Sequence, residues 1–210
     1  MATPLQTFRH SLGAQLHQRL GEGWRFYKSR LSLERQDEWG SLEISLNSVA
    51  KFSPWVDFSI AFQRRFAPPQ ALLGAVDGAV LDYGQNSHNR RFMKGLPQGG
   101  SAPGTWPANI SQPVSEALVQ ELYRFIEHTV LPFDAHFGQP EHWREDLVAG
   151  RDSDGNRRTP EQRWRAVLVL DMWLGQPEQF RTWLAGSRLK AATQTEALAA
   201  LARCQAVQAT

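Results

Sequence analysis

This sequence of 210 residues has one cysteine, a small net charge and no long apolar run. The single cysteine, Cys204, cannot form a disulfide within the chain, which excludes a disulfide-stapled scaffold. The longest apolar run, residues 166–174, is interrupted by Asp171 and is far shorter than the roughly 20 residues of a membrane-spanning helix. The first residues lack the apolar segment of a signal peptide. We therefore expect a cytoplasmic globular protein with no membrane association.

Recognisable catalytic and metal-binding motifs are also missing. The sequence has no nucleophile elbow, no phosphate-binding loop and no dinucleotide fingerprint. His128, His136 and His142 lack the i, i+4 spacing of a helical zinc site. Residues 152–156 begin like a calcium loop, but Arg157 stands where the sharp turn requires glycine. The sequence therefore predicts no catalytic residue, no metal and no cofactor.

The charge balance argues against nucleic acid as the main partner. Lysine and arginine number 23 and aspartate and glutamate 21, which leaves a net charge of +2. A nucleic-acid-binding domain generally shows a much stronger basic excess, because its affinity comes largely from the phosphate backbone. Binding to DNA or RNA is thus not favoured by composition.

Alternating apolar and polar residues dominate the stretch from Trp24 to Phe66. Residues 42–47 and 56–63 alternate at a period of two, which is typical of strands with one face in a core. The pattern predicts three strands, the first over about 24–33, the second ending near residue 50 and the third near residue 66. Short connections between them favour an antiparallel meander.

Helical signals flank this sheet. Thr3-Pro4-Leu5-Gln6 has the residues of a capping box, and apolar residues follow at steps of three and four. Residues 77–110 are rich in glycine and proline and predict a long loop, with a possible short strand at 80–83. From about Pro113 onward the periodicity is helical except for a polar, charged loop over 150–158, and Pro132 is expected to end the first of these helices. The remaining helices are expected over 140–148, from Thr159 to Gly175, from Pro177 onward, and over 194–207.

Together these patterns predict an α+β fold. It has an antiparallel meander sheet of three to five strands packed against an N-terminal helix and a C-terminal set of helices. We expect a single domain over residues 1–210, with the helix, sheet and long loop in 1–110 and the helical half in 111–210.

Two basic clusters mark a candidate binding surface, one at the end of the third strand and one in the following loop. If they meet in space, they form a basic, partly aromatic patch that can hold phosphate or an acidic partner. If they do not, they are a solvated strand end and a loop. A tryptophan beside Gly40 in a turn is the one most expected to be exposed. The partner-binding candidates are therefore Arg64, Arg65, His88, Arg90, Arg91 and Trp39.

Asp171 interrupts the most apolar helix of the chain. An unpaired buried carboxylate is costly, so it is expected to be paired or neutralised. One interpretation is a salt bridge to an arginine of a neighbouring helix, or an exposed stripe. The other is a buried switch or a partner-binding acid.

Short segments along the chain carry a family resemblance. They are residues 24–27 (WRFY), 42–46 (LEISL), 58–62 (FSIAF), 130–133 (VLPF) and 173–178 (WLGQPE). Their order resembles a family of small bacterial proteins described only as a domain of unknown function, and similar domains are found among the immunity proteins of bacterial toxin systems. The resemblance defines no catalytic residues, so none is carried over to this chain.

The resemblance and the missing catalytic motifs lead to one main hypothesis. The chain is expected to be a non-enzymatic protein-binding module, an immunity-like protein that binds and neutralises a partner toxin. A first alternative is a small-ligand protein or an enzyme that acts on an anionic substrate at the sheet edge and the 77–110 loop. A second alternative is an RNA-binding accessory protein.

Overall fold

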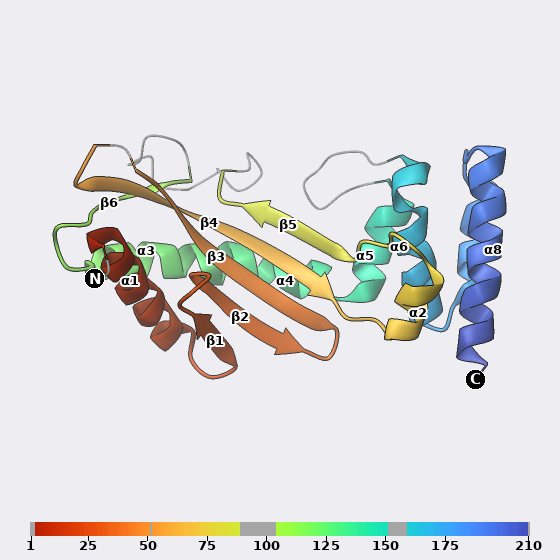
Figure 1. Cartoon of the computed structure of the whole chain (residues 1–210), viewed down its shortest axis with the longest axis horizontal. Coiled ribbons are helices and arrows are strands. Elements are labelled where there is room, and N and C mark those ends of the chain that lie inside the picture. Colours follow the sequence, from red (N-terminus) through yellow and green to blue (C-terminus); the bar gives the residue numbers. More distant parts are fainter. Residues whose placement is uncertain (1–2, 51, 89–103, 151–158, 210) are drawn as a thin grey trace. The chain divides into compact units, whose positions relative to one another are not determined.

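The computed structural model of the chain describes residues 3–50, 52–88, 104–150 and 159–209 (Figure 1). Its internal contacts divide it into two compact units. Unit 1 consists of Met1–Arg64 and Gly84–Asp134, and unit 2 consists of Arg65–Tyr83 and Ala135–Thr210. This division does not follow the two halves expected on either side of residue 110.

Fifteen elements follow one another in the described residues, and their order matches an α+β fold. None of the helices in the described segments is long and apolar enough to cross a membrane. In chain order the elements are α1 (Pro4–Leu20), β1 (Trp24–Tyr27), β2 (Ser32–Asp37), β3 (Gly40–Ala50), β4 (Trp55–Phe66), α2 (Gln70–Ala75), β5 (Asp82–Asn86), β6 (Trp106–Asn109), α3 (Glu116–Phe125), the π-helix η1 (Ile126–Val130), α4 (Leu131–Phe137), α5 (Pro140–Val148), α6 (Pro160–Trp173), α7 (Pro177–Gly186) and α8 (Ala191–Gln208).

The strands form one antiparallel sheet in the order β1-β2-β3-β4-β5, with β6 also paired to β4. This confirms the predicted α+β class and the meander, with six strands in the sheet. The prediction of a single first strand over 24–33 is wrong, because the chain turns back between Tyr27 and Ser32, which face each other in the β1–β2 ladder. Leu31 makes that turn possible by adopting a left-handed backbone with φ of 53°.

Strand β6 lies in a segment that the sequence predicted as loop. It pairs antiparallel with β4, and Trp55 faces Asn109 while Phe58 faces Trp106. Pro107 is exposed within it. Proline has no N–H for a ladder and is tolerated in edge strands, and among the described strands β6 pairs with β4 and no other. The proline content that suggested a loop is therefore compatible with an edge strand.

Helix α1 covers part of the sheet in unit 1. Its first turn has the predicted capping box, in which the Thr3 hydroxyl accepts the Gln6 N–H at 3.2 Å and the Gln6 side chain accepts the Thr3 N–H at 3.0 Å. The helix contacts α3, β1 and β2. The Phe8 ring stacks on Phe58 of β4 with centroids 5.6 Å apart. The predicted apolar stripe of this helix is thus a core face, with Phe8, Leu12 and Leu16 buried.

A nearly continuous helical segment runs from α3 through η1 into α4. The prediction that Pro132 ends this helix is wrong, because Pro132 lies in the first turn of α4. The π-helical turn before it closes with the Leu131 N–H bonded to the Ile126 carbonyl. The π-helical turn interrupts the regular i→i−4 hydrogen-bond pattern just before Pro132, and this accommodates a residue that has no N–H. The segment therefore continues to Phe137 and brings Asp134 with it.

Unit 2 is built around α6, which contacts α2, α5, α7 and α8. Residues 166–172 of α6 are all buried, as in a helix that is covered on every side. The Phe66 ring stacks on Trp143 of α5 at 4.9 Å between centroids. Asp171 of α6 is fully buried and receives two hydrogen bonds from Arg144, at 2.5 and 3.1 Å. The predicted salt bridge from Asp171 to an arginine of a neighbouring helix is therefore confirmed.

Candidate functional site

Arg64 lies on the buried face of β4. Phe58, Ile60 and Phe62 occupy this face at every second position, and Arg64 is the next residue in the series. Its side chain is 1% exposed. The structure thus places Arg64 in the core, where its guanidinium cannot belong to the exposed basic patch that the sequence suggested. A buried guanidinium requires charged partners, because arginine does not lose its proton in proteins.

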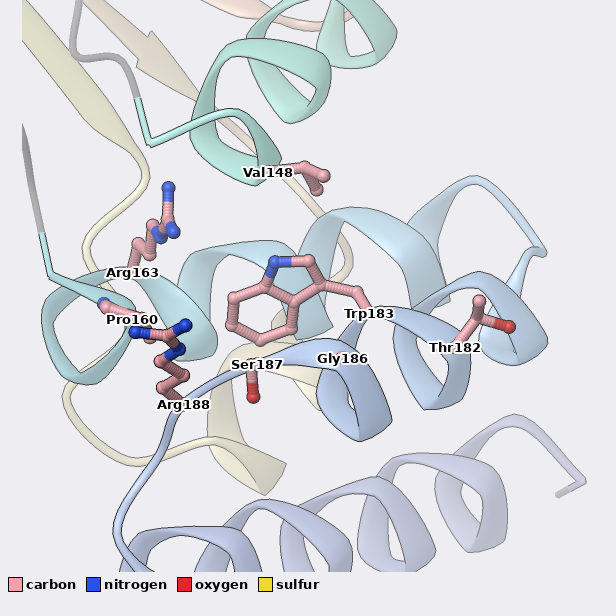
Figure 2. Close-up of a pocket in the computed structure, with 8 residues that line it drawn as sticks. All are labelled: Val148, Pro160, Arg163, Thr182, Trp183, Gly186, Ser187 and Arg188. Atoms are coloured by element: carbon pink, nitrogen blue, oxygen red, sulfur yellow. The ribbon is translucent and has the colours of Figure 1, made fainter.

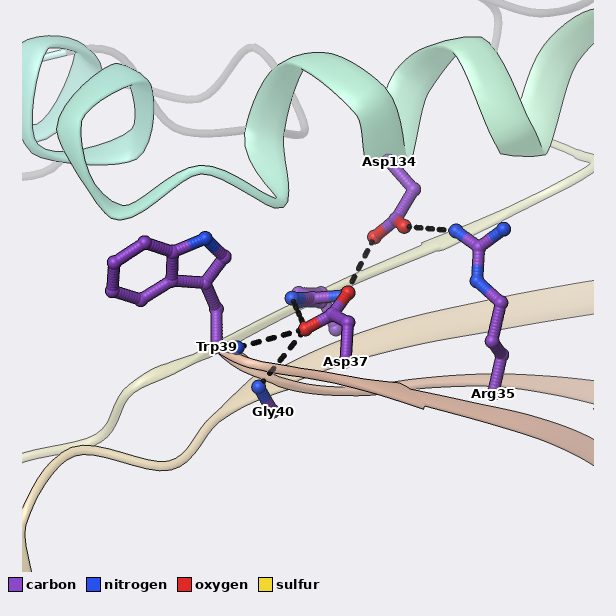
Figure 3. Close-up of polar contacts among 6 residues, drawn as sticks. Arg35, Asp37, Trp39, Gly40 and Asp134 are labelled. Atoms are coloured by element: carbon purple, nitrogen blue, oxygen red, sulfur yellow. Dashed lines mark hydrogen bonds and ion pairs between the residues drawn. The ribbon is translucent and has the colours of Figure 1, made fainter. Parts of the chain in front are cut away.

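Two carboxylates surround the Arg64 guanidinium. Asp37, the last residue of β2, accepts hydrogen bonds from both Nη atoms of Arg64 at 2.6 Å. Asp134 of α4 lies 3.6 Å from Arg64 and accepts Arg35 Nη2 at 3.1 Å. Figure 3 shows the Asp134 carboxylate pointing from its helix toward Asp37 and Arg35. The four side chains form an ion-pair network within unit 1.

The two carboxyl groups respond differently to this environment. Burial raises the pKa of Asp134 above its ordinary value, and the nearby Arg64 and Arg35 offset only part of this effect. Burial also raises the pKa of Asp37, but hydrogen bonds from Arg64 and from two backbone N–H groups outweigh it, so its pKa lies below 3.8. The more exposed carboxylate is therefore the one that keeps its charge most readily opposite Arg64.

The network stabilises the fold rather than offering a reactive group. Asp37 Oδ1 accepts the backbone N–H groups of Trp39 and Gly40 at 2.9 and 3.1 Å, which holds the β2–β3 turn (Figure 3). The same carboxylate binds Arg64 of β4. Asp134, at 3% side-chain exposure, adds α4 to the assembly. Its charged groups are engaged with one another, so we assign the network a structural role.

The register of β5 separates His88 from Arg64. The Ser87 N–H donates to the Ile60 carbonyl at 2.8 Å, so His88 follows at the level of residue 59 of β4. Five residues of extended chain lie between this level and Arg64, or about 17 Å at a rise of about 3.3 Å per residue. The two predicted clusters therefore do not meet at these two side chains.

The other predicted partner-binding residues have different surroundings. Arg65 is exposed, and Arg90 and Arg91 lie outside the described residues. Trp39 is half-buried in the turn that Asp37 holds. The most exposed tryptophan is Trp55, at 52%. The expectation that Trp39 is the most exposed tryptophan is therefore wrong.

Sequence reasoning missed an apolar tip at the end of the β3–β4 hairpin. Phe52 is 84% exposed, Val49 61% and Trp55 52%. We call these three residues the hairpin tip. A signal for it was present in the sequence, since a phenylalanine and a tryptophan flank Ser53-Pro54, where a solvated turn would have polar residues. Exposed apolar clusters of this kind often mark interaction surfaces.

A groove of about 620 Å³ lies beside α1 in unit 1. One wall is formed by five α1 residues, and the other by the segment 110–114 that follows β6. The Ile110 N–H donates to the Pro54 carbonyl at 2.9 Å, which ties this segment to the base of the hairpin tip. The residues lining the groove are Pro4, Thr7, Phe8, Ser11, Gln15, Ile110, Ser111, Gln112, Pro113 and Val114, none of which carries a charge.

Metal and nucleophile candidates find no supporting geometry among the described residues. No group of three or more His, Cys, Asp or Glu side chains there could hold a metal ion. The His136 and His142 rings stack at 4.9 Å, and His142 Nδ1 contacts the His136 carbonyl at 3.0 Å. Cys204 is buried, and burial raises the pKa of its thiol. The calcium-like segment 152–156 lies outside the described residues.

Comparison with models of protein families, with curated proteins and with solved structures gave no match. The class of this protein therefore rests on its own architecture. It is an α+β protein whose described residues form a six-stranded antiparallel sheet, a buried ion-pair network and an exposed apolar tip with an adjoining groove.

Proposed function

We propose that this chain is a non-enzymatic protein-binding module, an immunity-like protein that holds a partner toxin inactive by covering part of its surface. The hairpin tip is the observation that carries the proposal, because it exposes Val49, Phe52 and Trp55 within seven positions of the chain. Aromatic side chains are enriched at protein interfaces and dominate their energetics. The class of partner comes from the resemblance in the order of the sequence elements.

The tip is held in place before any partner arrives. The Trp55 N–H donates to the Phe52 carbonyl at 2.7 Å and closes the turn. Trp55 also faces Asn109 in the β4–β6 ladder, and the Ile110 N–H bonds to the Pro54 carbonyl. A preorganised contact surface loses less conformational entropy on binding, and this favours affinity.

The chemistry of the surface specifies the kind of partner. The groove lining and the described residues of the tip, 47–50 and 52–56, carry no charge, and Lys51, outside the described residues, is the one charged residue in the sequence of the tip. The complementary surface should therefore be an apolar pocket with neutral polar groups at its edge. Association through it should depend only weakly on salt, because Lys51 is the one charged residue over 47–56 and few ions are displaced. Binding to RNA through basic clusters would instead weaken steeply as salt rises.

The test is co-expression with the toxin-like product of a neighbouring reading frame in the native host. We expect a tight complex and protection of the host from the toxin. The variant Phe52→Ser/Trp55→Ser should weaken binding by about 1,000-fold or more, since truncating a hot-spot aromatic costs about 2–4 kcal/mol and every 1.4 kcal/mol is about tenfold. Leu198→Ser, which alters an exposed side chain of α8 at 49% exposure, is the matched control and should bind as the wild type does.

Three results would argue against the proposal. They are no complex with any neighbouring product, a complex that survives the double tip substitution unchanged, and an affinity that falls steeply between low and high salt. Because the tip side chains are exposed, the double variant should keep the circular dichroism spectrum of the wild type. A loss of binding can then be assigned to the surface itself.

A further inference from the structure

A second pocket, of about 450 Å³, lies in unit 2 between the end of α5, the start of α6 and the end of α7 (Figure 2). Its volume falls in the range of about 300–1,000 Å³ that is typical of small-molecule sites. Its described lining includes two arginines and one tryptophan, and none of the described residues that line it is acidic. The lining residues are Val148, Pro160, Arg163, Thr182, Trp183, Gly186, Ser187 and Arg188.

The two arginines make the pocket positively charged, and among the described residues neither forms an ion pair with an acidic side chain. Arg163 donates from Nη1 to the Leu147 carbonyl at 2.5 Å, and its buried Nε has no acceptor among the described residues. Burial lowers the pKa of Arg163, which is the effect of removing a cation from water without a counter-charge. Arg188 is exposed and forms no hydrogen bond or ion pair with the described part of the chain. An anion in the pocket would supply the missing acceptor oxygens.

Trp183 supplies a flat apolar surface next to these charges. Its ring is half-buried, and the Arg163 guanidinium carbon lies 5.9 Å from its centroid. Figure 2 shows the indole in the middle of the lining residues, with Arg163 and Arg188 toward one edge of it. An aromatic ring packed against the indole would gain stacking and apolar burial beside the cationic groups.

The two hydroxyls of the pocket can only accept further hydrogen bonds. The Thr182 hydroxyl donates to the Glu178 carbonyl at 2.9 Å, and the Ser187 hydroxyl donates to the Leu184 carbonyl at 2.7 Å. A hydroxyl has a single hydrogen, so both oxygens are left as acceptors. They match a ligand whose ring carries N–H or O–H groups.

We propose that this pocket binds a small, flat aromatic anion that has a hydrogen-bond donor on its ring. Its carboxylate or phosphate is held by Arg163 and Arg188, its ring lies against Trp183, and its donor reaches the Thr182 or Ser187 hydroxyl. A nucleoside monophosphate and an amino-substituted aromatic carboxylate share this chemistry. The site is separate from the hairpin tip and does not depend on the partner proposed above.

Isothermal titration with four probes tests the proposal on the full chain. Adenosine monophosphate carries ring, donor and phosphate, and 4-aminobenzoate carries ring, donor and carboxylate. Adenosine lacks the anion, and inorganic phosphate lacks the ring. We expect at least one of the first two to bind at least tenfold more tightly than adenosine and phosphate, and the stronger of the two identifies the anionic group. No binding by either, or equal binding of inorganic phosphate, would overturn the proposal.

Variants locate the site. Arg188→Gln should weaken the stronger probe about tenfold, because a hydrogen bond to a charged group is lost. Lys190→Gln removes the same charge from an exposed residue two positions away and should change the affinity less than twofold. An equal loss in both variants would indicate general charge attraction and refute the assignment. The Phe52→Ser/Trp55→Ser variant should bind the probe as the wild type does, so this inference and the proposed function fail independently.

Discussion

Replacing Asp37 with asparagine should destabilise the protein more than replacing Asp134, although Asp134 is the more buried of the two, at 3% against 36% side-chain exposure. Removing one partner of a buried ion pair costs about 3–5 kcal/mol. Asp37 is one-third exposed and Asp134 remains 3.6 Å from Arg64, which reduces the expected cost for Asp37→Asn to about 2 kcal/mol. Asp134→Asn removes a carboxylate whose charged form burial already disfavours, and it should cost about 1 kcal/mol or less.

The two substitutions should also differ in the sign of their pH dependence. The pKa of Asp134 is raised on folding, so its stabilising contribution is present below the unfolded value of 3.8 and is lost as pH rises through the folded pKa. The pKa of Asp37 is lowered, so its contribution is present above 3.8 and is lost as pH falls through the folded pKa. Between about pH 3 and about pH 7, the stability difference between the wild type and Asp134→Asn should therefore shrink. Over the same range, the stability difference between the wild type and Asp37→Asn should grow.

Urea unfolding followed by near-ultraviolet circular dichroism measures both effects. A double-mutant cycle with Arg64→Met serves as the control. In a protein that lacks the guanidinium, Asp37→Asn should lower the free energy of unfolding by much less than it does in the wild type. The reasoning is refuted if Asp134→Asn costs as much as Asp37→Asn at pH 7. It is also refuted if the cost of Asp37→Asn persists in the Arg64→Met background.

Three further predictions concern packing and reactivity. Gly104→Ala should lower the free energy of unfolding by about 2 kcal/mol or more, because φ is +77° there and a Cβ would collide with the Ser87 carbonyl. Gly84→Ala, where the nearest atom to the added Cβ would be 3.7 Å away, should lower it by about 1 kcal/mol at most. Thermal unfolding compares the two variants, and similar losses would contradict the prediction. Arg144→Met should lower the free energy of unfolding by about 3–5 kcal/mol, because it leaves Asp171 buried without its arginine. Adding Asp171→Leu should restore most of this stability, as measured by urea unfolding. A double variant as unstable as the single one would contradict the prediction. Cys204 should react with Ellman's reagent at pH 8 only after unfolding, since its thiol is buried and burial raises its pKa. Rapid reaction of the native protein would contradict this burial.

Local signals predicted most of the helices and part of the sheet. The Thr3 capping box and the apolar stripe of α1 depend on residues within one or two helical turns, so the sequence alone predicted both. Strand β6 was missed because its proline content is typical of a loop, and its pairing with β4 supplies the partner that makes it a strand. The continuation of the helix past Pro132 was missed because it depends on a π-helical turn, which has no clear sequence signature.

The candidate sites were much less predictable than the fold. Arg64 continues the period-two core face of β4, but the sequence analysis assigned it to an exposed basic cluster at the end of the strand. The identity of its acidic partners required the tertiary structure, since Asp134 lies on a helix far along the chain. The exposure of Phe52 and Trp55 likewise depends on which segments reach the end of the hairpin.

The sequence by itself determined the α+β class, the core face of α1 and the alternating apolar positions of β3 and β4, because these follow from capping residues and from periods of 2 and 3.6. Only the tertiary structure decided which charges meet. Arg35 and Asp134 are 99 residues apart in the chain and form a hydrogen bond of 3.1 Å. It also decided which apolar side chains remain in water. Both outcomes depend on distances through space, and these are set by the packing of whole elements rather than by neighbours in the chain.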